Sequence, residues 1–202
     1  MFRKEKYNRI ERCTMCDKLK EIHGLSPKQI LEKCWQTPEY PVDMKKILSC
    51  LDIPFGSSDF SQLEKSLHLR RDNSVLGLAF SKGNNLQILT SNKLNPRTAN
   101  YVLAHELAHC CLHMEPTSAF HVELKTSYDI YSDLVNSPAK EIRDGDLGKE
   151  VTADIFAAQL LLPAGFSCRA EDIPKYADKY EVSEDIVKLK LQADNSLFKT
   201  RS

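Results

Sequence analysis

Residues 105–109 read His-Glu-Leu-Ala-His, and most of what this sequence predicts about its fold follows from them. On a helix, histidines at positions i and i+4 lie about 40° apart around the axis and one turn along it, so both imidazoles can reach one metal ion. Glu106 lies beside them, where its carboxylate can act as a general base on a metal-bound water. We therefore predict His105 and His109 as metal ligands and Glu106 as the catalytic residue.

A tetrahedral catalytic zinc site needs a third protein ligand and one open position. The metzincin pattern supplies a histidine ten residues after the first one, but here that position is Glu115. The nearest later histidine, His113, falls two turns beyond His105. We predict that His113 is a packed or hydrogen-bonded side chain and not a ligand.

A second helix, predicted from Glu150 to Leu162 and closed by Pro163, offers the missing ligand. Glu150 and Asp154 form an acidic pair one turn apart at the polar end of this otherwise apolar helix. Burying two like charges is costly unless a cation or a hydrogen-bond donor compensates them. We predict that Glu150 is the third ligand and that Asp154 accepts the free N–H of a ligand histidine, fixing its tautomer.

The two segments together resemble the ImmA/IrrE family of zinc metallopeptidases, whose pattern is approximately HELGHxxLH followed by ExEANxFAxxLLMP. The motifs stand at residues 105–113 and 150–163, and a weaker likeness extends over about residues 40–192. The sequence departs from the pattern at four positions without losing a predicted ligand or the base: Ala108 for glycine, Thr152 for the second glutamate, Asp154 for asparagine and Leu162 for methionine.

The resemblance implies a compact zincin fold, one catalytic Zn²⁺ ion and limited proteolysis of a regulatory protein. The implied partner is a transcriptional repressor of the helix-turn-helix type, from a mobile element or a stress response, which is cut to relieve repression. In such a site zinc lowers the pKa of its bound water to about 7, and Glu106 carries the proton to the leaving amine. Candidates for a second oxyanion donor are Tyr128, Tyr131 and His121. A zinc-bound sensor or anti-repressor that docks its partner without cutting it stays open as the alternative.

The order of elements predicts an α+β fold that is mainly helical and zincin-like, with a small antiparallel sheet and a C-terminal helical hairpin. At 202 residues the chain supports one domain with an appendage, taking about 150 residues per domain. We predict a helical appendage over 1–36, a catalytic domain over 37–164 and a helical segment packed on it over 165–202. The individual elements expected are helices at 29–35, 44–51, 96–113, 150–162, 173–180 and 183–191, an edge strand at 53–55, a hairpin of strands 74–80 and 86–90, and an irregular connection over 114–148 with a short helix at 128–135.

Composition restricts the partners and the compartment. Lys+Arg and Asp+Glu number 28 each, so the net charge is zero, and no basic block suits a phosphate backbone. We therefore expect a protein partner, with no direct binding to nucleic acid or membrane. The N-terminus lacks the apolar segment of a secretory signal, and the most apolar stretch, 155–166, is shorter than the ~20 residues of a spanning helix. These features predict a cytoplasmic protein.

The seven cysteines do not fit a complete disulfide framework, because their number is odd and Cys110 and Cys111 are adjacent. Reduced thiols are the expectation, with Cys110 and Cys111 packed in the core. A four-cysteine zinc site remains an alternative; it would use Cys13, Cys16, Cys34 and Cys50.

Overall fold

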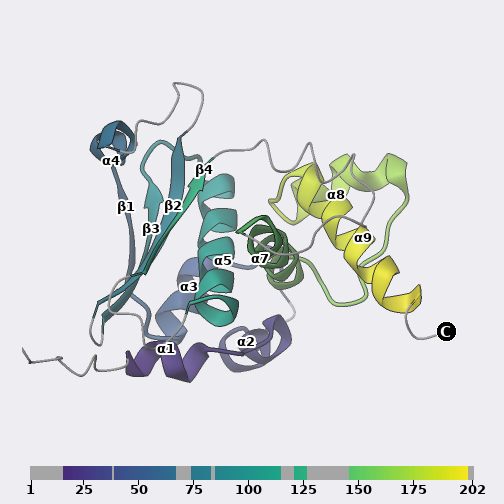
Figure 1. Cartoon of the computed structure of the whole chain (residues 1–202). Helices are drawn as coiled ribbons and strands as arrows, with labels where there is room; N and C mark the ends of the chain where they lie inside the picture. Colours follow the sequence, from purple (N-terminus) through teal and green to yellow (C-terminus); the bar gives the residue numbers. More distant parts are fainter. Residues whose placement is uncertain are drawn as a thin grey trace, which may run out of the picture.

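The computed structural model describes residues 16–37, 39–66, 74–82, 85–114, 121–126 and 146–199. Figure 1 shows its layers: a β-sheet, then helix α5 (Pro96–Leu112) packed on the sheet, then α7 (Asp146–Leu161) against α5. Helices α8 (Ile173–Lys179) and α9 (Glu184–Lys199) lie on the far side of α7. The α+β class predicted from the sequence is confirmed, and α5 is the helix that both the sheet and α7 cover.

The sheet has four strands in the order β1-β3-β2-β4 within the described part of the chain. The predicted hairpin is confirmed, since β2 (Val75–Lys82) and β3 (Asn85–Ser91) pair antiparallel. The prediction of an antiparallel sheet is wrong, because β1 (Phe55–Ser58) pairs parallel with β3 and makes the sheet mixed. The chain passes through α4 (Ser61–Ser66) and β2 between these two strands, and a connection of that length permits parallel pairing.

The fourth strand, β4 (His121–Thr126), pairs antiparallel with β2 at the other edge of the sheet. It falls within residues 114–148, where an irregular connection was expected, and so corrects that prediction. The short helix predicted at 128–135 lies outside the described residues.

Side-chain caps fix where the helices of the site and its support begin. Asn95 accepts a hydrogen bond from the Thr98 amide at 2.9 Å, and Pro96 fills the first turn of α5. Ser26 forms a capping box with Gln29 at the start of α2 (Pro27–Cys34). In the same way, Asp43 caps α3 (Met44–Cys50) through the amide of residue 45. Each of these caps accepts from a backbone amide only two or three residues later in the chain.

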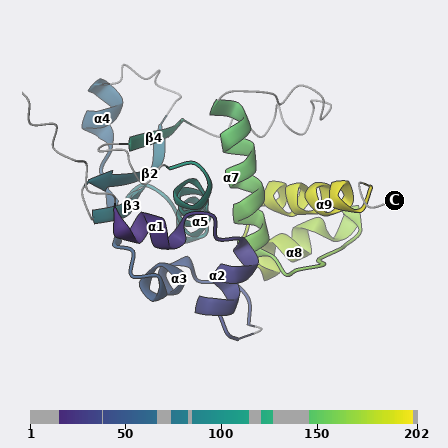
Figure 2. The ribbon, with the colours of Figure 1, turned by 60° about the horizontal axis from the view of Figure 1, so that its bottom comes forward.

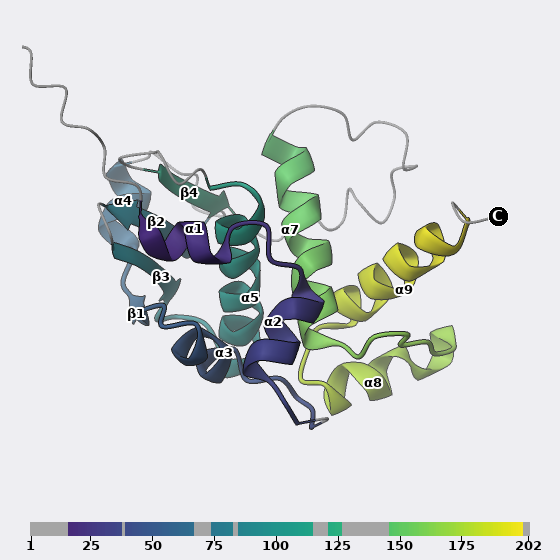
Figure 3. The same ribbon diagram turned by 90° about the horizontal axis from the view of Figure 1, so that it is seen from below.

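One hydrophobic cluster runs through the structure and includes the N-terminal helices. Leu19 and Ile22 of α1 (Asp17–Ile22) and Ile30 of α2 are fully buried in it. Figures 2 and 3 show α1 beside the sheet and α5, and α2 beside α7. The first helices thus support the core on which the site is built. The predicted boundaries after residues 36 and 164 are not tested by this packing and stay predictions.

The C-terminal helical hairpin is confirmed, with α9 continuing to Lys199, beyond the end expected at Leu191. Ser183 caps α9 by accepting from the Ile186 amide at 3.4 Å. Among the helices of the described ranges, none has both the length and the apolar character needed to cross a membrane.

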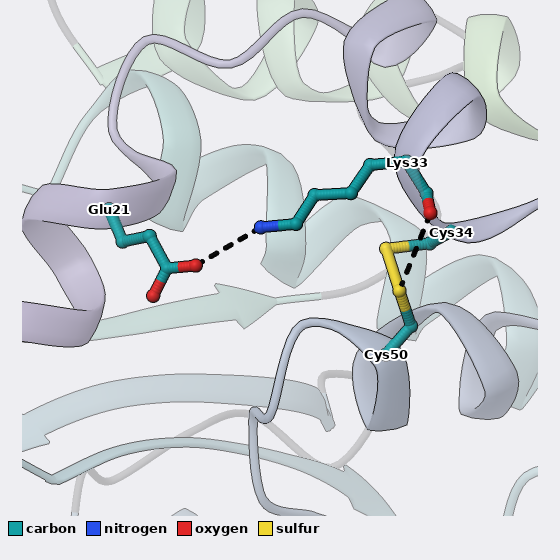
Figure 4. Close-up of a disulfide and its surroundings, with 4 residues drawn as sticks. All are labelled: Glu21, Lys33, Cys34 and Cys50. Atoms are coloured by element: carbon teal, nitrogen blue, oxygen red, sulfur yellow. Dashed lines mark hydrogen bonds and ion pairs between the residues drawn. A yellow bond between two sulfur atoms is a disulfide. The ribbon is translucent and has the colours of Figure 1, made fainter.

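Cys34 and Cys50 form a disulfide that joins the end of α2 to the end of α3 (Figure 4). The expectation of reduced thiols is wrong for this pair, and the disulfide also excludes both residues from a four-cysteine metal site. Folding brings their Cα atoms to 5.6 Å across a separation of 16 residues, and no local pattern reveals that approach. Cys110 and Cys111 take part in no disulfide and are fully buried, as expected.

Candidate metal centre

Three side chains predicted as ligands meet in the interface between α5 and α7. The Nε2 atoms of His105 and His109 lie 2.8 Å apart. The Glu150 carboxylate, from the first turns of α7, places one oxygen 3.1 Å from the His105 Nε2 and the other 3.3 Å from the His109 Nε2. The spacing of the two histidines on α5 brings their Nε2 atoms together, and the packing of α7 on α5 brings the Glu150 carboxylate to them.

The cluster is buried on its helix side and open at the carboxylate. His105 and His109 are 0% and 1% exposed, whereas 17% of the Glu150 side chain is exposed. Burial by itself raises the pKa of Glu150, but hydrogen bonds and charge interactions with both histidines outweigh it and hold that pKa well below its usual range. Glu150 is therefore a carboxylate at neutral pH.

Asp154 lies one turn after Glu150 and contacts the other nitrogen of the first histidine. Its Oδ1 atom is 2.5 Å from the His105 Nδ1, and the Tyr101 hydroxyl donates to the same oxygen. Because a carboxylate only accepts, the hydrogen of this contact belongs to Nδ1, which leaves Nε2 as the nitrogen of His105 that faces the cluster. The contact predicted for Asp154 with a ligand histidine is present.

The donor set fits a divalent cation. Two imidazole nitrogens and a carboxylate oxygen, all within 4.8 Å of one another, are the donors that zinc takes in sites of the His₂Glu type. Crowding acceptors in this way is unfavourable until a positive charge lies among them. Other first-row divalent ions accept the same donors, so the geometry supports a metal site without selecting zinc.

Glu106 packs against the sheet. Its side chain is buried, at 1% exposure, against β2 where that strand carries Gly77. A Cβ atom at Gly77 would lie 2.6 Å from the Glu106 Oε1 and 2.4 Å from the Val102 Cγ1, so a side chain there would have to displace its neighbours. Sequence reasoning missed this contact, although an isolated glycine inside a strand pattern is a signal of close approach.

His113 is hydrogen-bonded, as predicted, and stands on the far side of the His109 ring from the cluster. Its Nδ1 lies 3.0 Å from the His109 Nδ1, and its Nε2 lies 2.9 Å from the Thr152 Oγ1. Thr152 had no predicted role. Its contact with His113 could not be read from the sequence, because the two residues belong to different helices.

The candidate oxyanion donors are not placed by the structure. Tyr128 and Tyr131 lie outside the described residues. His121 is the first residue of β4, of which the backbone alone is described. Their role as donors stays a prediction.

No protein-family model matches this chain, and no curated protein matches it either. The resemblance to the ImmA/IrrE metallopeptidases accordingly depends on the motif residues of the sequence. The geometry adds that the three residues of the two motifs predicted to bind one ion lie within reach of a single ion.

Proposed function

We propose that this chain is a zinc-dependent endopeptidase of the ImmA/IrrE type that cuts a regulatory protein. The observation that carries the proposal is the convergence of His105, His109 and Glu150, with the buried carboxylate of Glu106 next to the first histidine on α5. In H-E-x-x-H peptidases a metal held by the two histidines and the glutamate that follows the first histidine together hydrolyse a peptide bond.

In the proposed mechanism His105, His109 and Glu150 hold the ion. Bound zinc supplies Lewis acidity, which lowers the pKa of water to about 7 and polarises the scissile carbonyl. Glu106 removes the proton of the attacking water at a carboxylate oxygen and returns it to the leaving amine nitrogen. Asp154 keeps the imidazole of His105 oriented with Nε2 toward the ligand cluster.

The substrate class rests on the resemblance and on charge. A neutral chain without a basic block favours a protein over a nucleic acid as partner. The family likeness points to a repressor with a helix-turn-helix, cut at few sites.

The decisive comparison is between the wild type and Glu106→Gln, both loaded with zinc. Each is added to a lysate of the cells that encode the chain, and new N-termini are labelled and identified by mass spectrometry. We expect cleavage of one or a few regulators by the wild type alone, with equal zinc binding by both proteins, because Glu106 supplies the base and no metal ligand.

Two results would count against the proposal. If both proteins bind zinc and leave identical N-termini while regulation is unaffected by Glu106→Gln, the chain acts by docking its partner. If the wild type rapidly digests casein, it is a general peptidase and the assignment of a regulatory substrate fails.

A further inference from the structure

A chain of hydrogen bonds leads away from the second ligand histidine on the side opposite the cluster. It runs from the Nδ1 of His109 to the Nδ1 of His113 at 3.0 Å, and from the Nε2 of His113 to the Thr152 Oγ1 at 2.9 Å. The Thr152 hydroxyl in turn donates to backbone carbonyls of its own helix, 2.9 Å away at Lys149 and 3.1 Å away at Gly148. These hydrogen bonds thus connect a histidine of α5 to the backbone of α7.

The direction of every hydrogen in this chain follows from its last acceptor. A carbonyl oxygen only accepts, so the single hydrogen of the Thr152 hydroxyl is directed to the helix backbone. Thr152 Oγ1 then accepts from the Nε2–H of His113, which leaves neutral His113 with a lone pair on Nδ1. That lone pair accepts the Nδ1–H of His109, so Nε2 is the nitrogen of His109 that faces the cluster and can bind an ion.

We propose that His113 and Thr152 are positioning residues that hold His109 in the tautomer whose Nε2 faces the metal ion. The inference rests on the proposed metal site and adds to it the control of its second histidine. Asp154 of α7 contacts the first histidine directly, whereas Thr152 of α7 acts on the second histidine through His113. An imidazole and a hydroxyl orient His109, so its support adds no third carboxylate to the face of α7 that already carries Glu150 and Asp154.

Four variants test the proposal through zinc affinity, measured by competition with a chromogenic chelator. His113→Leu removes the acceptor of the His109 hydrogen and should weaken zinc binding roughly 10- to 100-fold. Thr152→Val keeps the shape but removes the hydroxyl. It should cost roughly threefold, because water can replace an exposed hydroxyl in part. Thr152→Ser restores the hydroxyl and should return the affinity to that of the wild type. The fourth variant, Thr98→Val, makes the same chemical change near the start of α5 and should leave zinc binding unchanged.

A variant of His113 that needs no hydrogen bond from residue 152 tests whether Thr152 acts on His109 through His113. His113→Asn can place its side-chain oxygen where the Nδ1 of His113 was, accepting from His109 without help from residue 152. Zinc affinity should stay within about threefold of the wild type, and adding Thr152→Val should then have no further effect. Additive losses in the double variant would overturn the proposed order.

The tautomer itself is read from long-range ¹H–¹⁵N correlations of the imidazoles in the zinc-free protein. We expect His109 to carry its hydrogen on Nδ1 in the wild type and to populate both tautomers in His113→Leu. A hydrogen on Nε2 in place of Nδ1 in wild-type His109, or unchanged zinc affinity in both His113→Leu and Thr152→Val, would overturn the inference. Circular dichroism verifies folding, and if His113→Leu is unfolded, the Thr152→Val and Thr152→Ser pair decides.

Failure of the proposed function gives a different pattern. If the wild type binds no zinc, the metal site is refuted, whatever tautomer His109 adopts. If the variants lose zinc as expected but Glu106→Gln changes nothing in the lysate, the positioning roles stand and the peptidase activity is refuted.

Discussion

Replacing Gly77 with alanine should disturb the proposed catalytic base while sparing the metal ligands. Gly77 is buried in β2, where the strand meets α5, and its backbone angles are open to alanine. The added methyl carbon would stand 2.4 Å from the Val102 Cγ1 and 2.6 Å from the Glu106 Oε1. The effect of the substitution is therefore steric and acts on two neighbouring side chains of α5.

The magnitude follows from the overlap. Non-bonded carbon atoms pack best at about 3.5–4.0 Å, so the new contact with Val102 is more than about 1 Å too close. Both neighbours are buried and cannot swing into solvent, so either α5 shifts away from the sheet or Glu106 changes position. Overpacking of this kind costs typically 1–3 kcal/mol. A displacement of the base by about 1 Å lowers turnover by as much as roughly 10²-fold.

Gly56→Ala is the matched control, because it makes the same change in the same sheet on β1, which β3 separates from β2. Its Cβ would meet only Leu89 Cδ2, at an ordinary 3.6 Å. This control should unfold at the same urea concentration as the wild type or be stabilised by up to about 1 kcal/mol. The Gly77→Ala protein should unfold earlier and cut the substrate slowly, yet bind zinc normally. If it matches Gly56→Ala in urea and the wild type in turnover, the contact between Gly77 and Glu106 has no functional role.

Four further predictions use the same purified protein. Asp154→Asn should weaken zinc binding roughly 10- to 100-fold, because the asparagine lacks the charge that orients His105; competition with a chelator measures this, and equal affinity would contradict it. Zinc at a hundredfold excess over its Kd should stabilise the fold by about 2.7 kcal/mol in urea titrations, and a chelator should reverse this; an unchanged midpoint would refute the site. Burial raises the pKa of the Cys111 thiol to about 12, so iodoacetamide at pH 8 should label this cysteine in urea but not in the folded protein. Mass spectrometry measures the labelling, and equal rates in both conditions would show that the thiol is accessible in the fold. Because the pKa of Glu150 is lowered in the fold, its ionised form stabilises the zinc-free protein above the ordinary carboxyl pKa of about 4.5, and this contribution is lost as the pH falls further. The urea midpoint should therefore drop more steeply on acidification in the wild type than in Glu150→Gln. Parallel curves for the two proteins would rule this out.

The parts of the fold that could be predicted are those decided within a few residues. Asn95 caps α5 through an amide three residues later, and Ser26 does the same for α2. The spacing of His105 and His109 is likewise a property of one helix. Each signal and its structural consequence lie on the same turn, so no knowledge of the tertiary packing is needed.

Contacts between distant segments could be predicted only where a buried charged side chain requires a compensating partner. Glu150 and Asp154 were assigned because two carboxylates on a buried helix need compensation, and the structure places both beside histidines. The parallel pairing of β1 with β3 and the Cys34–Cys50 disulfide involve no such requirement. Neither strand and neither cysteine carries a local sequence signal that identifies its partner, so both pairings become visible only in the folded structure.

Thr152 and Gly77 show the same limit at the site itself. A threonine within a helix commonly bonds to a carbonyl three or four residues earlier, so its sequence context gives no sign of a contact with His113. The glycine signals that something approaches closely, but nothing near it in the sequence identifies Glu106. Side chains that support a site from neighbouring elements are therefore the last to become visible.

The two halves of the proposed chemistry lie on different faces of one helix. His105 and His109 face α7, where Glu150 meets them, whereas Glu106, about 100° around the axis from its neighbour, packs on β2. The distance between the base and the metal position is therefore set by how α5 is held between the sheet and α7. A substitution in either packing surface should alter turnover without removing a ligand, since it moves one face of α5 relative to the other. The same packing explains why α5 is buried without interruption from Val102 to Cys111, because the sheet covers one face of the helix and α7 covers another.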